Sequence, residues 1–351
     1  MMDEPKPIRE GEELDLATLE TYLKDTVKEL SGAVSLKQFP GGFSNLTYSL
    51  TVGDRDLILR RPPFGSKVKS AHDMGREYRV LHALHPVYPA APRPLLLCND
   101  TDVMGCPFYV MERIKGVILR GKKPAGFSTS PEETGVICKS LIKNLADLHA
   151  IDYEKIGLGD LRKEGSYVQR QVEGWIKRYG DSQTDEIAAI DEVAKWCHAH
   201  MPADSEAALI HNDYKFDNVV LAADDLSRII GVLDWEMCTI GDPLMDLGTS
   251  LGYWMEPRDT TIGVVQCFMT TEPGAPTRAE VADHYAALTG RNVSNMQFYY
   301  VFALYKLAVI VQQIYFRYKK GLTKDERFAP LIFMVGALGA TGLNCIESGE
   351  I

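Results

Sequence analysis

The sequence lacks several features that would place it in an extracellular or redox class. It has no CxxC pair, and its seven cysteines are scattered and odd in number, so it gives no sign of a disulfide framework. Its first residues are acidic and polar, without the apolar core of a signal peptide. These absences predict reduced thiols and a cytoplasmic location.

The sequence also lacks an apolar run long enough to span a membrane, which needs about 20 mainly apolar residues. The most hydrophobic stretch, residues 301–316, is interrupted by Lys306, Gln312 and Gln313, so we expect a buried helix there. The net charge is -10, whereas a nucleic-acid partner favours a basic surface. We therefore expect neither a membrane nor a nucleic acid as partner, and the oligomeric state stays open.

What the sequence does contain is a change of hydrophobic period along the chain. In the first 115 residues, alternating apolar residues between Gly/Pro turns predict strands at 34–39, 43–52, 56–61, 95–98 and 107–114. Helical spacing predicts helices near 19–30, 71–84, 131–149, 165–180, 184–200, 278–288, 295–319 and 326–346. A strand pair is expected at 218–221 and 228–233. The predicted class is α+β, with a β-rich lobe over 1–115, a hinge near 113–116 and a helical lobe over 116–351.

The sharpest chemical pattern is H-x-D-x-x-x-x-N, which runs from His211 through Asp213 to Asn218. Phosphoryl transfer needs a carboxylate to orient the attacking hydroxyl and oxygen ligands for the magnesium ions that bridge the phosphates. The spacing places Asp213 and Asn218 at opposite ends of one short loop, so both can face the same phosphate. The hairpin that follows returns the chain and ends at Asp234, which offers a second metal ligand.

These motifs, in this order, resemble the aminoglycoside phosphotransferase and choline kinase-like branch of the protein-kinase-like superfamily, over residues 36–251. The resemblance implies a bilobal protein-kinase-like fold. It also implies transfer of the γ-phosphate of ATP, with GTP left open, to the hydroxyl of a small molecule. In this family Asp213 would be the catalytic base, and Asn218 and Asp234 would hold Mg²⁺. His211 is expected to brace the loop by hydrogen bonds.

The segment after Asp234 looks like a further motif of the same family. We expect Asp242 and Asp246 to be structural, with Asp242 capping a helix that has Pro243 at its first position. Asp234 is followed by Trp235, and no D-F-G or A-P-E pattern is present, which disfavours a protein kinase.

A glycine-rich turn lies between two predicted strands and contains Gly42, Ser44 and Asn45. Such a turn lets backbone N–H groups approach phosphates, although an ordinary hairpin turn has the same composition. The resemblance to the family's G-x-S-N favours nucleotide binding. The strand predicted at 107–114 resembles the family's hinge strand, so that Met111 and Glu112 would lie at the adenine.

The strand that ends in Arg60 and Arg61 departs from the family, which usually has a lysine here for the α- and β-phosphates. Because side chains alternate along a strand, the two arginines point to opposite faces. Arg60 aligns better with the family's lysine, although the sequence leaves open which of the two contacts the phosphates. Glu77, on the following helix, would position that arginine. A solvated glutamate on a helix face is the alternative.

Three phrases, LILRRPP, REYRVLHAL and VLDWEMCTIGDPLMDLG, resemble phosphotransferase-like domains found alone in bacteria or fused to acyl-CoA dehydrogenases. That subgroup implies a hydroxyacyl-CoA-like acceptor. Aminoglycoside enzymes hold a polycation with many carboxylates. The C-terminal third mixes acidic residues with aromatic ones and does not predict such a pocket; the acidic ones are Glu256, Asp259, Glu280 and Asp283. The alternatives are an aminoglycoside or choline-like amine kinase, or a catalytically silent nucleotide-binding module.

Overall fold

A computed structural model covers the 351 residues and describes all of them except residues 1–3, 41–44, 66–72, 122, 260–266 and 324. The chain divides into two compact units. The first consists of residues 1–118, 156–158 and 218–238, and the second of residues 119–155, 159–217 and 239–351. The boundary expected at 115/116 lies near the end of the first segment, but residues 218–238 return to the first unit.

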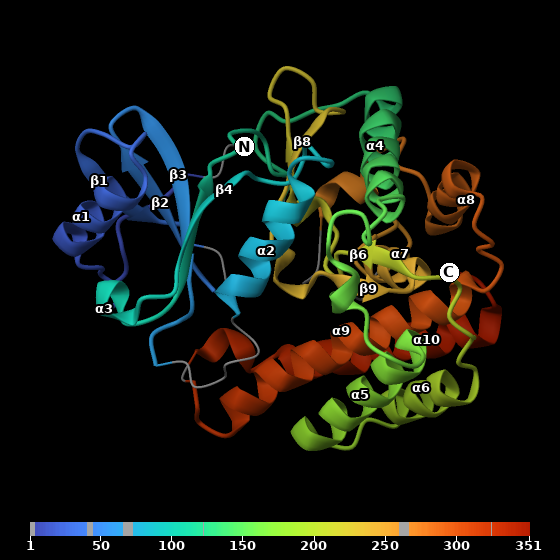
Figure 1. Cartoon of the computed structure of the whole chain (residues 1–351). Helices are drawn as coiled ribbons and strands as arrows, with labels where there is room; N and C mark the ends of the chain where they lie inside the picture. The colour runs from blue at the N-terminus through green and yellow to red at the C-terminus, as the bar shows by residue number, and fades with distance from the viewer. Residues whose placement is uncertain (1–3, 41–44, 66–72, 122, 260–266, 324) are drawn as a thin grey trace. The chain divides into compact units, whose positions relative to one another are not determined.

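The first unit is built on a five-stranded antiparallel sheet in the order β1-β2-β3-β5-β4 (Figure 1). Its elements are α1 (Leu16–Thr26), β1 (Val34–Gln38), β2 (Leu46–Val52), β3 (Arg55–Arg61), α2 (Met74–Leu84), β4 (Pro94–Cys98), α3 (Thr101–Met104) and β5 (Phe108–Glu112). A turn at Gly53, with a φ of 59°, joins β2 to β3. A Cβ atom on Gly53 would lie 2.3 Å from the Ser31 carbonyl oxygen, so this turn requires glycine.

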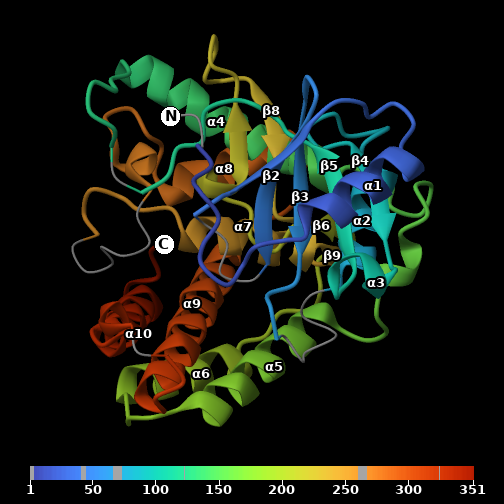
Figure 2. The ribbon, with the colours of Figure 1, turned by 90° about the vertical axis from the view of Figure 1, so that its left-hand side faces the viewer.

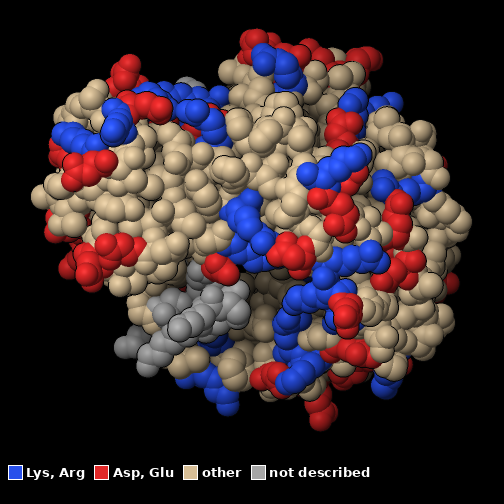
Figure 3. All heavy atoms as spheres, viewed as in Figure 1, with Lys and Arg blue, Asp and Glu red and all other residues tan. Residues whose placement is uncertain are grey.

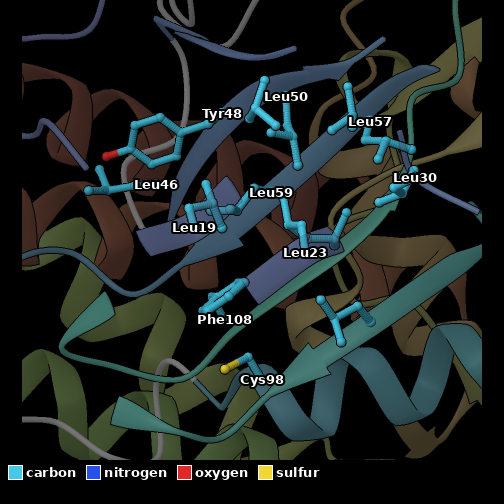
Figure 4. Close-up of a cluster of buried hydrophobic side chains, with 14 residues drawn as sticks. Leu19, Leu23, Leu30, Leu46, Tyr48, Leu50, Leu57, Leu59, Cys98 and Phe108 are labelled. Carbon is cyan, nitrogen blue, oxygen red and sulfur yellow. The ribbon is translucent and has the colours of Figure 1, made fainter. Parts of the chain in front are cut away.

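Different helices cover the two faces of this sheet (Figures 1 and 2). On one face, Leu19 and Leu23 of α1 belong to the same buried cluster as Leu57 and Leu59 of β3 (Figure 4). Burying each of these leucines contributes roughly 1.5–3 kcal/mol to folding. Because side chains alternate along a strand, Arg60 points to the opposite face, which α2 covers.

The hairpin of β7 (Val219–Leu221) and β8 (Ile229–Val232) completes the first unit. It follows the 3-10 turn η2 (Phe216–Asn218) and leads into η3 (Trp235–Met237). The backbone groups of Val117 and Leu221 exchange two hydrogen bonds of 2.8 Å, which attach the hairpin to the end of the first segment. The Trp235 ring packs edge-on against Tyr88, at 6.0 Å between centroids.

The second unit is mainly helical. Its elements are α4 (Pro131–His149), α5 (Tyr167–Ser182), α6 (Ala188–Ala199), β6 (Ala208–Ile210), β9 (Thr239–Gly241), α7 (Pro243–Gly252), α8 (Arg278–Thr289), α9 (Met296–Lys319) and α10 (Leu331–Ser348), with short 3-10 turns η1 (Gly159–Leu161), η4 (Phe268–Thr271) and η5 (Glu326–Phe328). Helix α9 packs against α5, α6, α7 and α10, and Figure 2 shows it alongside α10. The two short strands β6 and β9 pair antiparallel and flank the loop that carries the H-x-D motif.

Helix starts in this unit follow local capping chemistry. Ser130 and Glu133 form a capping box at the start of α4, where Pro131 takes the first position. The predicted cap of α7 is confirmed, because the Asp242 side chain accepts a 2.8 Å hydrogen bond from the Leu244 backbone.

The predicted α+β class is confirmed, and the long helices lie close to their expected bounds. The first helix was predicted to reach residue 30 but ends at Thr26. Helix α9 and the segment 326–348, which includes η5 and α10, are long and apolar enough to cross a membrane by length and composition. Most of α9 is nevertheless buried inside the unit, as expected for residues 301–316.

Candidate active site

Arg60, at the end of β3, is the centre of a buried ion-pair cluster in the first unit. Its Nη2 lies 3.0 Å from Asp234 Oδ1, and its Nε lies 3.5 Å from Glu77 Oε2. Only 2% of the Glu77 side chain and 9% of the Arg60 side chain are exposed. Glu77 is therefore not a solvated glutamate on the surface of α2. Its carboxylate lies beside the Arg60 guanidinium, where it can position that side chain.

Arg60 and Arg61, between which the sequence left the choice of phosphate-binding arginine open, lie on opposite faces of the sheet. Arg61 points to the other face of the sheet, where its Nε donates to the Pro62 carbonyl and its guanidinium lies 3.7 Å from the centre of the Phe64 ring. Arg60 is thus the arginine beside the carboxylates of Glu77 and Asp234.

The charge states in this cluster depend on one another. Burial disfavours the charged guanidinium, but the carboxylates around it, led by Glu77, outweigh burial and raise the pKa of Arg60. Burial also raises the pKa of Glu77, and Arg60 opposes that change. Removing Arg60 would leave Glu77 as an uncompensated buried carboxylate, which is strongly destabilising. Without Glu77, in contrast, the guanidinium would still pair with Asp234 and Glu236.

Asp234 and Asn218 lie at the same end of the β7–β8 hairpin. In the register of that hairpin Val219 faces Val232, and the Leu233 N–H donates a 2.8 Å hydrogen bond to the Asn218 carbonyl. Asp234 has a φ of 68°, in the left-handed region, which turns the chain sharply where β8 ends. Two residues with oxygen-bearing side chains thus lie at the same end of one hairpin.

Glu236 is a further carboxylate in this cluster, and sequence reasoning did not single it out. Its Oε2 accepts a 2.7 Å hydrogen bond from Asn45 Nδ2 and lies 3.4 Å from Arg60 Nη2. Arg76 of α2 donates to the backbone carbonyls of Glu236 and Cys238. The signal available in the sequence was a second acidic residue two positions after Asp234.

The other residues predicted to bind the nucleotide differ in their surroundings, and two of them lie outside the described residues. Gly42 and Ser44 lie outside the described residues, whereas Asn45 is buried and bonded to Glu236. Met111 is buried and pairs with Ile58, on the sheet face that also carries Arg60. Glu112 Oε1 instead accepts a hydrogen bond from the Arg93 backbone N–H.

The H-x-D loop belongs to the second unit and is held by Asp246 of α7. Asp246 Oδ2 and Oδ1 accept 2.7 Å hydrogen bonds from the backbone N–H groups of His211 and Asn212. Burial raises the pKa of the Asp246 carboxyl, but contacts with His149 and His211 outweigh burial and hold its pKa below the usual value. Asp246 therefore has the structural role expected for it, because its carboxylate holds the backbone of the H-x-D loop.

Two histidines complete this support. The His211 ring accepts a 3.3 Å hydrogen bond at Nδ1 from the Asp213 backbone, consistent with the bracing role expected for it. The ring of His149, at the end of α4, bonds to Asp246 at 3.1 Å and to the Tyr285 hydroxyl at 2.7 Å. The contact between His149 and Asp246 joins residues 97 positions apart in the sequence.

Asp213 carries a partner that the sequence analysis missed. The Lys215 ammonium lies 2.8 Å and 2.9 Å from the two Asp213 oxygens, and it also lies 4.1 Å from the centre of the Tyr253 ring. Both side chains of the pair are 22% exposed. Burial, followed by the Asp213 charge, raises the pKa of Tyr253, so this hydroxyl stays protonated. The available signal was a lysine two residues after the motif aspartate.

The predicted residues thus fall into two sets. Arg60, Glu77, Asn218 and Asp234 belong to the first unit, and Asp213 belongs to the second. The chain passes from one unit to the other at the 217–218 peptide bond. Five residues of chain can separate the Asp213 and Asn218 Cα atoms by at most about 18 Å.

Comparisons with known proteins show the family to which this chain is similar. Residues 35–288 match the model of a family described as "Phosphotransferase enzyme family". The chain is 34% identical over 336 residues to acyl-CoA dehydrogenase family member 11 of Rattus norvegicus, covering 94% of this chain and 43% of that protein. The chain spans less than half the length of the curated relatives it matches.

Solved structures extend the comparison to the fold. A candidate aminoglycoside phosphotransferase from Ralstonia eutropha is 30% identical, with a TM-score of 0.81 over 96% of this chain and 99% of that one. Aminoglycoside phosphotransferase APH(4)-Ia, solved with AMP-PNP and hygromycin B, is 16% identical. It has a TM-score of 0.58 over 93% of this chain and 98% of its own, a likeness of fold alone. The chain belongs to the phosphotransferase enzyme family and has its kinase-like fold.

Proposed function

We propose that this protein transfers the γ-phosphate of ATP to a hydroxyl of a small molecule, with Mg²⁺ bound at Asn218 and Asp234. The observation that carries the proposal is the cluster around Arg60. There a buried cation is ion-paired to Glu77 and to the predicted metal ligand Asp234. A cation held in this way suits the α- and β-phosphates of a nucleotide, and its planar fork can bind two phosphate oxygens at once.

The residues at the hairpin end fit magnesium. Asn218 and Asp234 both offer oxygen atoms, which Mg²⁺ prefers, and it commonly takes only one or two carboxylates, with phosphates and waters filling the rest. No cluster of three His, Cys, Asp or Glu side chains with metal-binding geometry occurs among the residues the structure describes. A metal held partly by the nucleotide agrees with that sparse donor set. Magnesium held by Asn218 and Asp234 would offset the negative charge of the nucleotide's phosphates.

Asp213 would act as the base for the acceptor. In the proposed step the acceptor hydroxyl donates its proton to the Asp213 carboxylate while its oxygen forms a bond to the γ-phosphorus. The bond from that phosphorus to the β–γ bridging oxygen breaks, and ADP leaves. The Lys215 ammonium now bonds to both Asp213 oxygens, so it would shift toward the transferred phosphate as the hydroxyl arrives.

The acidic residues of the C-terminal third support an acceptor other than a polycation. Glu256 and Asp259 are both ion-paired with Arg278, and Glu256 also pairs with Arg258. Glu280 closes the capping box of α8. Three of the four acidic residues named in the sequence analysis are thus engaged within the protein. On the face in Figure 3, acidic and basic side chains are interleaved over the second unit and form no continuous acidic surface.

The names of the curated relatives favour an acyl-CoA-related acceptor, because acyl-CoA dehydrogenase family members 10 and 11 match over nearly the whole chain. A hydroxyacyl-CoA-type compound is therefore the acceptor we propose first. The alternative acceptor is an aminoglycoside or a choline-like amine. The alternative function is a nucleotide-binding module without catalytic activity.

The test is ADP release with Mg²⁺ and either ATP or GTP across aminoglycosides, choline-like amines, sugars and hydroxyacyl-CoA compounds. We expect turnover to depend on a hydroxyacyl-CoA compound. We expect it to fall at least about a hundredfold in Asp213→Ala, since general-base catalysis contributes 10²–10⁴-fold. Asp283→Ala, at an exposed position in α8, is the matched control. Efficient phosphorylation of an aminoglycoside alone would refute the acceptor class, and full activity in Asp213→Ala would remove Asp213 from its role.

A further inference from the structure

Lys306 lies in the middle of α9 and is the one lysine among the described residues that is buried, at 6% exposed. Burial lowers the pKa of Lys306, which means that the folded protein pays a free-energy cost to keep this ammonium charged. A methionine of similar volume would avoid that cost. The contacts of the lysine therefore need a reason other than packing.

The Lys306 ammonium donates a 3.1 Å hydrogen bond to the backbone carbonyl of Asn212, the residue before Asp213. Asn212 has a φ of 69°. Among the described residues, Asn212 and Asp234 are the two non-glycine positions in the left-handed region. Such a conformation costs on the order of 1–3 kcal/mol and persists only where the surroundings hold it.

Two more side chains hold the same residue. The Asn212 N–H donates to Asp246 at 2.7 Å, and the Tyr167 hydroxyl donates to Asn212 Oδ1 at 2.9 Å. The carbonyl, the N–H and the side chain of Asn212 are thus each bound from a different helix, namely α9, α7 and α5. Lys306 supplies the contact that acts on the peptide group joining Asn212 to Asp213.

We infer that Lys306 is a positioning residue for phosphoryl transfer, which fixes the left-handed turn at Asn212 and thereby aims the Asp213 carboxylate. The inference rests on the proposed function, because it assigns Lys306 to the step in which Asp213 is the base. The charged groups that face the ammonium are Asp213 and Lys215 of the loop, Asp246 of α7 and Arg178 of α5. The ammonium also lies 5.9 Å from the centre of the Trp175 ring.

The test compares Lys306→Met with Lys319→Met, which makes the same change at an exposed position of the same helix. We expect kcat to fall at least about tenfold in Lys306→Met, because small misplacements of a reacting group cost up to 10²-fold. KM for ATP should stay within about twofold and the midpoint of thermal unfolding should not fall, since a buried charge has been removed. Lys319→Met should match the wild type in all three. A wild-type kcat in Lys306→Met, or an equal loss in both variants, would overturn the inference.

Tyr167→Phe gives a second, milder variant that acts on the same residue. If both contacts work through Asn212, the activity losses of Lys306→Met and Tyr167→Phe should combine to less than the product of the single losses. Independent, fully multiplicative losses would contradict a shared action on Asn212.

Hydrogen exchange separates this inference from the proposed function. In Lys306→Met the backbone amides of residues 211–213 should exchange faster than in the wild type, whereas in Lys319→Met they should not. Absence of turnover in the wild type with every acceptor would refute the proposed function, and with it a catalytic purpose for Lys306. Unchanged exchange at 211–213 with normal turnover in Lys306→Met would refute the positioning role while leaving the proposed function intact.

Discussion

At the scale of single residues, Asp246 connects stability to the candidate site. Its fully buried carboxylate accepts two backbone hydrogen bonds from the H-x-D loop and bonds to His149. The loop conformation therefore depends on the ionisation of a residue that takes no part in the proposed chemistry.

This dependence has a defined sign with pH. The pKa of Asp246 is lower in the folded protein than its ordinary value of 3.8. The ionised carboxylate therefore stabilises the fold at pH values above 3.8, and that contribution is lost as the pH falls through the folded pKa. Asp246→Asn should lower the free energy of unfolding by about 3 kcal/mol at neutral pH, as expected when a buried charged contact is broken.

The measurement is urea unfolding at a series of pH values for the wild type, Asp246→Asn and the exposed control Asp283→Asn. The difference between the wild type and Asp246→Asn should shrink below pH 3.8. A difference that stays constant with pH would show that the lost stability comes from packing and not from the charge of Asp246.

At the scale of helices, α7 carries Asp246 and must lie close to α9. Gly248 of α7 allows this approach, because a Cβ atom there would lie 2.7 Å from the Tyr299 carbonyl oxygen of α9. Gly180 of α5, in contrast, has no atom within 4 Å of the corresponding position.

These two glycines make a matched pair for mutation. Gly248→Ala should lower the free energy of unfolding by about 1–3 kcal/mol, since the added methyl group must push the helices apart. Gly180→Ala should be neutral or stabilising by up to about 1 kcal/mol, because alanine is the better helix former and has room. Both values are measured by denaturant unfolding, and equal effects at the two positions would show that the α7–α9 approach is not tight.

Helices and strands differ in how far the sequence predicted them. The long helices have many periodic positions, so α4 and α9 were predicted to within a residue or so. The strands β6 and β9 have three residues each, too few for a period, and neither was predicted. The same limit applies to the site. Alternation already predicted that Arg60 and Arg61 point to opposite faces, and the family resemblance preferred Arg60. The contact of Lys306 with Asn212, in contrast, spans 94 residues and depends on tertiary packing.

At the scale of the whole molecule, the proposed roles assign nucleotide binding and proton abstraction to residues of different units. Asp234→Ala should therefore remove the rise in melting temperature that ATP and Mg²⁺ produce, whereas Asp213→Ala should keep it. A ligand at a hundredfold its Kd stabilises by about 2.7 kcal/mol, which is easily detected. Differential scanning fluorimetry with and without ATP and Mg²⁺ checks this, with Asp283→Ala as control. Loss of the shift in Asp213→Ala would contradict the division of roles.

The return of residues 218–238 to the first unit has a consequence for biosynthesis. The five strands of the sheet have all left the ribosome soon after residue 112 is made, but Asp234 follows more than 100 residues later. During that interval Arg60 and Glu77 have only each other as charged partners in the cluster, and their unit lacks its last hairpin. Residues 119–155 and 159–217 of the second unit are therefore synthesised before the β-rich unit has its last hairpin, so the β-rich unit cannot be finished before synthesis of the second unit is well under way.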